Sequence, residues 1–188
     1  RRKRNDWMQK MLLRDNKMAD VGLISTLERN VTFFASSTLL ILAGLLTAMA
    51  SAEKLSLMLS NLVPWASYTE GAVQLKLLLL VFIFVFAFFR FSWSMRQYTF
   101  AALLIGSLPS PQDFESGKFD RESFAARASN MVGLAAETFN DGLRAYYMSF
   151  ALMAWFFSST AFMIATAVVV LILYKREFRS DVLQVLKD

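Results

Sequence analysis

Apolar residues in this chain occur in long blocks separated by charged segments. Residues 31–50 form a run of 20 without a charged side chain, and residues 145–174 form a run of 30. A bilayer with a hydrocarbon core of about 30 Å requires about 20 apolar residues of α-helix. Helices in soluble cores are seldom so long and so free of charge. The pattern predicts transmembrane helices over 31–50 and 146–174.

A third apolar segment lies between these two runs. No Gly or Pro occurs between Ala72 and Ile105, so one uninterrupted helix is predicted over residues 72–108. With a rise of about 1.5 Å per residue, such a helix is longer than the bilayer is thick. We expect it to tilt or to project into the cytoplasm.

The remaining segments are polar or mixed. Residues 1–30 combine basic side chains with apolar ones at helical spacing, which predicts an amphipathic helix on the membrane surface with Trp7 among the headgroups. A solvated helix that packs on its own protein remains an equal alternative. Residues 51–71 are predicted to form a loop. Residues 109–145 are predicted to hold a loop and a second amphipathic helix, and residues 175–188 a basic tail.

The fold class expected from these elements is an all-α, polytopic membrane bundle. It has three transmembrane helices in this chain and two amphipathic cytoplasmic or interfacial helices. The chain starts with Arg and not with Met, so the natural N-terminus is expected to be missing.

Basic residues are distributed unevenly between the ends of the predicted spans. Residues 1–30 hold eight Lys and Arg residues and residues 109–144 hold four, whereas Lys54 is the only one in 51–71. The positive-inside tendency therefore places the first two segments in the cytoplasm and residues 51–71 outside. Three crossings then leave the tail, with its four basic residues, on the outer side, against that tendency. A re-entrant fold of 72–108 would remove the conflict, but that segment contains no helix breaker.

Composition excludes several kinds of chemistry. Hydrophobic residues make up 56% of the chain and charged residues 19%, whereas soluble domains carry about a quarter charged residues. With no Cys and no His, disulfides, thiolate or imidazole metal sites and Ser–His–Asp triads are excluded. We predict no enzymatic activity, cofactor or metal site. The net charge of +5 flanks the apolar runs, so it indicates topology and not binding to nucleic acid.

Four aromatic stretches resemble one known family. They are the run from Arg29 through Phe33 and Phe34 to Thr38, the run Phe91–Tyr98, the pair Leu143–Tyr147 and Trp155–Phe156, and the run Tyr174–Ser180. Together they are similar to a bacterial inner-membrane family known as domain of unknown function 599. The resemblance implies a multi-pass protein of the inner membrane with four helices, of which one, a fourth transmembrane helix, would precede the basic segment and is missing from this chain. It implies no activity and no catalytic residues.

The polar residues of the long helix form the main candidate site. Arg90 and Gln97 are two helical turns apart and share a face, with Arg96 beside them. A charge within the membrane usually has a partner or water, so these residues are candidates for lining a pore or an anion site. In the alternative interpretation, which we favour, both Arg side chains reach the cytoplasmic interface and bind lipid phosphate or an acidic loop residue. Trp7, Arg144, Tyr146 and Tyr147 are candidate interfacial or lipid-contact residues.

Two functions are compatible with this pattern. The first is a homo-oligomeric channel-like or transport protein, and the second is an accessory or scaffold subunit of a larger membrane complex. Expected partners are membrane lipid, anionic on the cytoplasmic side, and either further copies of the chain or another membrane protein.

Overall fold

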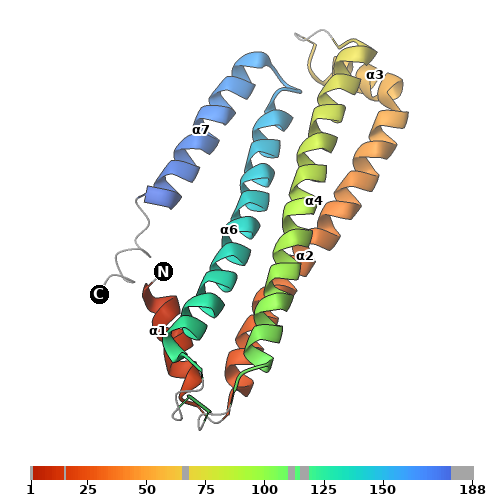
Figure 1. The fold of residues 1–188 in the computed structure, drawn as a ribbon. Helices are drawn as coiled ribbons and strands as arrows, with labels where there is room; N and C mark the ends of the chain where they lie inside the picture. Colours follow the sequence, from red (N-terminus) through yellow and green to blue (C-terminus); the bar gives the residue numbers. More distant parts are fainter. Residues whose placement is uncertain (1, 15, 65–67, 110–112, 115–118, 179–188) are drawn as a thin grey trace. The chain divides into compact units, whose positions relative to one another are not determined.

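The computed structural model describes residues 2–14, 16–64, 68–109, 113–114 and 119–178 (Figure 1). The all-helical prediction is confirmed for these residues, which form helices and no strand. The helices are α1 (Arg2–Leu12), α2 (Met18–Ala50), α3 (Ala52–Leu62), α4 (Glu70–Gly106), α6 (Arg121–Ala154) and α7 (Ser159–Phe178).

Contacts divide the chain into two units, and three helices contribute to both. Unit 1 comprises Arg1–Ala35 and Arg90–Asn140, and unit 2 comprises Ser36–Phe89 and Asp141–Asp188. Helices α2, α4 and α6 are each continuous through the residue at which the units divide. The uncharged stretches 36–50, 77–89 and 145–174 therefore belong to unit 2, whereas the uncharged stretch 97–112 belongs to unit 1.

Two helices, α2 and α4, are long and apolar enough to cross a membrane. Helix α4 is uninterrupted from Glu70 to Gly106 and so ends two residues before the helix expected over 72–108; its Gly residues occur only at positions 71 and 106. Only 11% of the most apolar window of α2 and 28% of that of α4 are buried. These windows are therefore exposed in the folded chain and do not form a closed core.

Helix boundaries near the N-terminus differ from the prediction. The amphipathic segment expected over 1–30 is two helices, and α2 already begins at Met18, well before the predicted span. Met8 and Met11 of α1 are fully buried in unit 1. Their burial favours the alternative in which α1 packs on its own protein over a helix that lies on the membrane surface.

The loop predicted over 51–71 is also wrong in part, because α3 fills Ala52–Leu62. Pro64 and Gly71 suggested a loop, but the stretch before Pro64 is rich in Leu, Lys, Glu and Met, which favour helix. Helix α3 ends where the Val63 amide donates to the Leu59 carbonyl at 2.9 Å, one residue before Pro64. Trp65, Pro111 and the tail after residue 178 lie outside the described residues.

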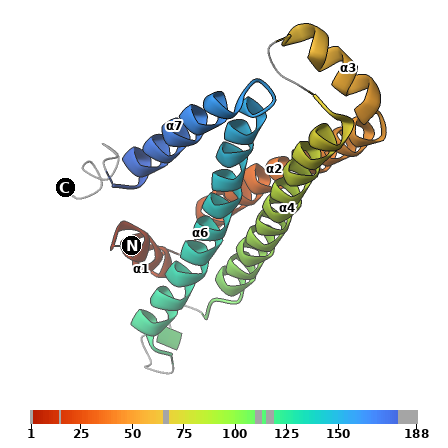
Figure 2. The same ribbon diagram turned by 90° about the horizontal axis from the view of Figure 1, so that it is seen from above.

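The largest correction concerns the span predicted over 146–174. The structure ends α6 at Ala154, turns through residues 155–158, and begins α7 at Ser159. Helix α7 runs back along the last part of α6, so the two form a helical hairpin within unit 2 (Figures 1 and 2). The amphipathic helix and the start of the predicted span are one continuous helix, α6. Three crossings are therefore not what the structure provides.

Unit 1 is held together by apolar and aromatic contacts between its helical segments. Phe34 of α2, Phe91 of α4 and Phe139 of α6 form a ring cluster with centroids 5.4–5.5 Å apart. The Ser94 hydroxyl donates to the Ala135 carbonyl at 2.7 Å in a buried contact between α4 and α6. Such hydrogen bonds fix the register of neighbouring helices.

Unit 2 has two small buried clusters. Ala52, Val73 and Leu77 pack with side chains from the end of α2, from α3 and from the α6–α7 turn, including Phe156. Leu80, Phe84 and Leu152 form the second cluster, deeper along the helices. The end of α2, the start of α4 and the α6–α7 turn therefore meet at one end of unit 2.

Candidate functional site

The α6–α7 turn contains no Gly or Pro, so another feature must stop the helix. The ammonium of Lys76 in α4 donates to the Trp155 carbonyl at 2.9 Å. The Tyr68 hydroxyl donates to the Phe156 carbonyl. One side chain in α4 and one just before it thus supply hydrogen-bond donors to the first two carbonyls after α6, which a continuing helix would have paired with backbone amides.

The other polar groups of the turn are satisfied locally. The amides of residues 155, 156 and 157 each donate to the carbonyl three residues earlier, at 3.0–3.1 Å. Ser158 then caps α7, because its hydroxyl accepts from the Ala161 amide at 3.0 Å. Irregular backbone is tolerated at membrane depth only where its polar groups are satisfied by protein or water. This turn meets that condition almost entirely with protein groups.

Lys76 also lies among three aromatic rings. Its nitrogen is 5.6 Å from the ring centroid of Tyr68, 5.2 Å from that of Trp155 and 5.4 Å from that of Phe156. We call Lys76, Tyr68, Trp155 and Phe156 the aromatic box. Ring faces and a helix C-terminus both carry partial negative charge, so the box stabilises a cation.

The opposite end of the hairpin is closed by ion pairs. The Arg144 guanidinium donates to both carboxylate oxygens of Glu177, at 2.6 and 2.9 Å, and to Asp141 at 2.9 Å. The hydrogen bonds with Glu177 raise the pKa of Arg144 above its ordinary value. Arg176 donates to the Tyr147 hydroxyl at 3.3 Å and lies over its ring. Arg144 and Tyr147, predicted as lipid contacts, here join α6 to α7.

Tyr146 was predicted as an interfacial anchor, but its hydroxyl points into unit 2. It lies 2.6 Å from the Thr38 hydroxyl, and Phe84 packs edge-on against its ring with centroids 5.1 Å apart. Thr38 is completely buried. Tyr146 therefore joins α6 to α2 and α4 within unit 2.

The predicted polar stripe on α4 is only partly assembled. Gln97 is buried, with 8% of its surface exposed, and Arg90 is half-buried on the same face. Arg96 is exposed and points away from that face. The Gln97 side-chain oxygen accepts no hydrogen bond within the described part of the chain. Arg90 and Gln97 thus remain candidates for one site, and Arg96 does not join them.

Trp7 contributes to a buried polar contact that sequence did not indicate. Its indole N–H donates to Asp20 Oδ1 at 2.7 Å, and Arg14 donates to the same oxygen at 2.8 Å. Asp20 is 2% exposed and lies in the first turn of α2, where a carboxylate is favoured by the helix dipole. The contact fastens α1 to α2.

Helix α1 also reaches α6 through Arg4. The guanidinium of Arg4 lies where a Cβ on Gly133 would be, because an added Cβ would come within 2.6 Å of Arg4 Nη2. Gly133 is buried, so the lack of a side chain there makes room for the guanidinium.

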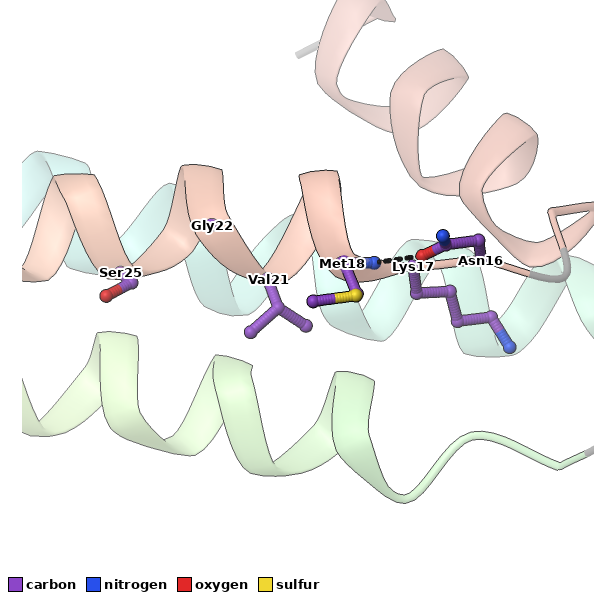
Figure 3. A pocket seen from close by; sticks show the side chains of 6 residues that line it. All are labelled: Asn16, Lys17, Met18, Val21, Gly22 and Ser25. Atoms are coloured by element: carbon purple, nitrogen blue, oxygen red, sulfur yellow. Dashed lines mark hydrogen bonds between the residues drawn. The ribbon is translucent and has the colours of Figure 1, made fainter.

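A shallow hollow lies beside the start of α2 in unit 1. Figure 3 shows Lys17, Met18, Val21 and Ser25 projecting to the same side of the helix, with Asn16 capping the Met18 amide at 2.9 Å. The hollow brings together no acid and no further polar group. Among the described residues, no group of three Asp or Glu side chains could hold a metal ion.

Comparison with known families tests the resemblance noted from the aromatic stretches. The family model described as "Protein of unknown function, DUF599" matches residues 1–182. This chain belongs to the DUF599 family. No curated protein and no solved structure matches it. Membership in DUF599 confirms the family predicted from sequence and brings no activity with it.

The aromatic box is another feature of this DUF599 chain that sequence reasoning missed. Lys76 is separated from Trp155 by 79 residues, and Tyr68 from Phe156 by 88. One signal was available: Lys76 is a lone charge at the edge of an apolar block, and such a charge needs a partner. Its partner could not be identified without the fold.

Proposed function

We propose that this DUF599 protein is a multi-pass membrane protein that self-associates into a channel-like or transport assembly. The observation that carries the membrane assignment is the exposure of the apolar windows of α2 and α4, of which 11% and 28% are buried. An apolar helix in a soluble core is largely buried. Leu40 of α2 is 77% exposed and Phe82 of α4 is 62% exposed, and both suit contact with lipid.

The hairpin supports a topology in which the Arg144 part of α6 and the end of α7 lie on the same side. The C-terminal end of α2, the N-terminal end of α4 and the α6–α7 turn cluster together in unit 2, so the other ends of these helical segments point the opposite way. The positive-inside tendency assigns the basic segments 1–30, 109–144 and 175–188 to the cytoplasmic side. Among the described residues, Lys54 lies in α3 and Lys76 lies beside the α6–α7 turn. This arrangement satisfies the positive-inside tendency, which three crossings violated.

Small residues on the exposed face of α2 support self-association. Ser36, Ala43, Gly44 and Thr47 are all exposed and recur at helical spacing. A Cβ added to Gly44 would meet no atom within 4 Å. Faces of this kind let membrane helices approach one another closely. Ala48 faces inward instead, against the cluster around Val73, so Gly44 and Ala48 do not form one contact pair.

The polar face of α4 supports a transport role over a purely structural one. Arg90 cannot lose its proton in any realistic environment, and it shares its face with the buried Gln97. In an assembly, such a face is suited to line a path for anions or water.

A comparison of two Arg variants in liposomes tests this role. We expect Arg90→Leu to change ion flux while the mass of the assembly in mild detergent stays the same. Arg96→Leu serves as the matched control, because Arg96 is exposed on another face of the same helix. Equal flux for both variants and the parent protein, in anionic and in neutral lipid, would contradict the role assigned to Arg90.

A scaffold function is the second candidate, and the Phe residues of α4 favour it. Phe82, Phe86 and Phe89 fall at helical spacing and are 62%, 48% and 65% exposed. A rigid aromatic face suits docking against another membrane protein. Purification in mild detergent separates the candidates, because a stable foreign partner supports the scaffold and a symmetric homo-oligomer supports the channel.

A further inference from the structure

We propose that the aromatic box is a cation-binding site that Lys76 occupies as a tethered ligand, and that it accepts a small primary alkylammonium when the Lys76 side chain is removed. This inference goes beyond the proposed function and does not rest on it. The fold of unit 2 alone carries it, and detergent-solubilised protein is sufficient to test it.

The geometry around the Lys76 nitrogen is that of a recognition site for an ammonium. One N–H donates to the Trp155 carbonyl at 2.9 Å. The rings of Tyr68, Trp155 and Phe156 surround the same nitrogen at 5.2–5.6 Å. Aromatic cages of this kind recognise organic ammonium ions in other proteins, because each ring face attracts a cation within about 6 Å.

The charge on the nitrogen is balanced without an acid. Among the described residues, no carboxylate is within salt-bridge distance of Lys76, and the nearest acid along α4, Glu70, accepts instead from Gln74 at 2.9 Å. The end of α6 supplies partial negative charge through its carbonyls. Carbonyls at interrupted helices are also the groups that hold cations in membrane transporters.

The box does not depend on Lys76 alone for its shape. Tyr68 is fixed by its own hydrogen bond to the Phe156 carbonyl, and the Trp155 ring stacks on Phe162 with centroids 5.5 Å apart. Both rings therefore remain in place when the Lys side chain is shortened. The space left by Lys76→Ala has the size and polarity of n-propylammonium, which is the fragment that the substitution deletes.

Thermal unfolding of Lys76→Ala tests the proposal directly. We expect its midpoint to fall by about 4–8 °C, the shift that a loss of a few interactions gives in a chain of this size. Added n-propylammonium chloride should restore at least half of that loss, whereas n-propanol and sodium chloride at equal concentration should not. Lys54→Ala is the matched control, because Lys54 is exposed on α3; we expect no ammonium-specific gain there.

A second variant covers the case in which Lys76→Ala does not fold. Lys76→Met keeps an apolar stem of nearly the same length and removes the terminal ammonium group. We therefore expect ammonium chloride to stabilise this variant and to change Trp155 fluorescence, with Trp155→Phe as the reference. Adding Tyr68→Leu to either variant should abolish the gain. The proposal is overturned if neither folded variant responds to an ammonium beyond the salt and alcohol controls, or if Lys54→Ala responds equally.

Discussion

Single residues in this protein act through partners that lie outside their own helix. Asp20 looks like an ordinary acid at a helix start, yet it is buried and receives hydrogen bonds from Trp7 and Arg14. Gly133 looks like a weak point in α6, yet it makes room for Arg4. Sequence could locate such residues on helices but could not identify their partners, because tertiary packing brings the partners together.

Asp20→Asn should loosen the attachment of α1. The amide has one acceptor oxygen and no charge, so the bonds from Trp7 and Arg14 weaken, at a cost of about 1–3 kcal/mol for a buried charge-assisted contact. We expect faster hydrogen exchange in α1 and at the start of α2. Glu53→Gln on the exposed surface of α3 should leave exchange in α1 unchanged, and an equal change in both variants would contradict this role for Asp20.

Gly133→Ala and Gly22→Ala should differ in effect although both lie within helices. A Cβ at Gly22 would meet nothing within 4 Å, so alanine should stabilise by up to about 1 kcal/mol through helix propensity. At Gly133 the new Cβ must displace the Arg4 guanidinium, which should cancel or reverse that gain.

Combining Gly133→Ala with Arg4→Ala provides the control. With the guanidinium gone, we expect the full helix gain of about 1 kcal/mol to appear at Gly133. Chemical denaturation measures all four variants. A gain at Gly133 that is the same with and without Arg4 would show that the two residues do not compete for space.

At the level of helices, the sequence predicted helices correctly where neighbouring residues determine them. It failed where contacts with distant parts of the chain determine them. Helix α4 is continuous because Gly and Pro are absent between Ala72 and Ile105. The same reasoning predicted one helix over 146–174 and was wrong there. The turn at 155–158 depends on Lys76 and Tyr68, and no pattern within the span reveals them. Helix α3 was missed because Pro64 suggested a loop, although the residues before it favour helix.

We expect ion pairs to hold α6 and α7 together at the end of the hairpin opposite the turn. Arg144 and Glu177 are 44% and 50% exposed, so solvent screens the pair and its contribution should be only about 0.2–1 kcal/mol. We expect Glu177→Arg to increase hydrogen exchange in the last turns of α7.

Reversing both charges tests whether the pairing itself matters. The double variant Arg144→Glu with Glu177→Arg should recover part of the protection in α7, although Asp141 then faces a like charge. Recovery should shrink at high salt, where exposed pairs are screened. If the double variant is no better protected than Glu177→Arg alone, the pair does not fasten α7.

For the whole molecule, sequence predicted the class of fold better than its connectivity. The blocks of uncharged residues gave the apolar helices, and the aromatic stretches gave the family. The sequence alone showed that three crossings would place the basic tail on the outer side, against the positive-inside tendency. In the proposed topology the hairpin of α6 and α7 removes that conflict, because it returns residue 178 toward the part of unit 2 where Arg144 lies.

Labelling of single Cys residues in sealed vesicles tests the proposed topology most directly, because the chain has no Cys of its own. Cys is introduced separately at Ser60 in α3, at Ser107 after α4 and at Phe178 at the end of α7, all exposed positions. Ser107→Cys and Phe178→Cys should react with an impermeant maleimide from the cytoplasmic side, and Ser60→Cys from the opposite side only. Labelling of position 178 on the side of position 60, or of all three positions from one side, would contradict the account.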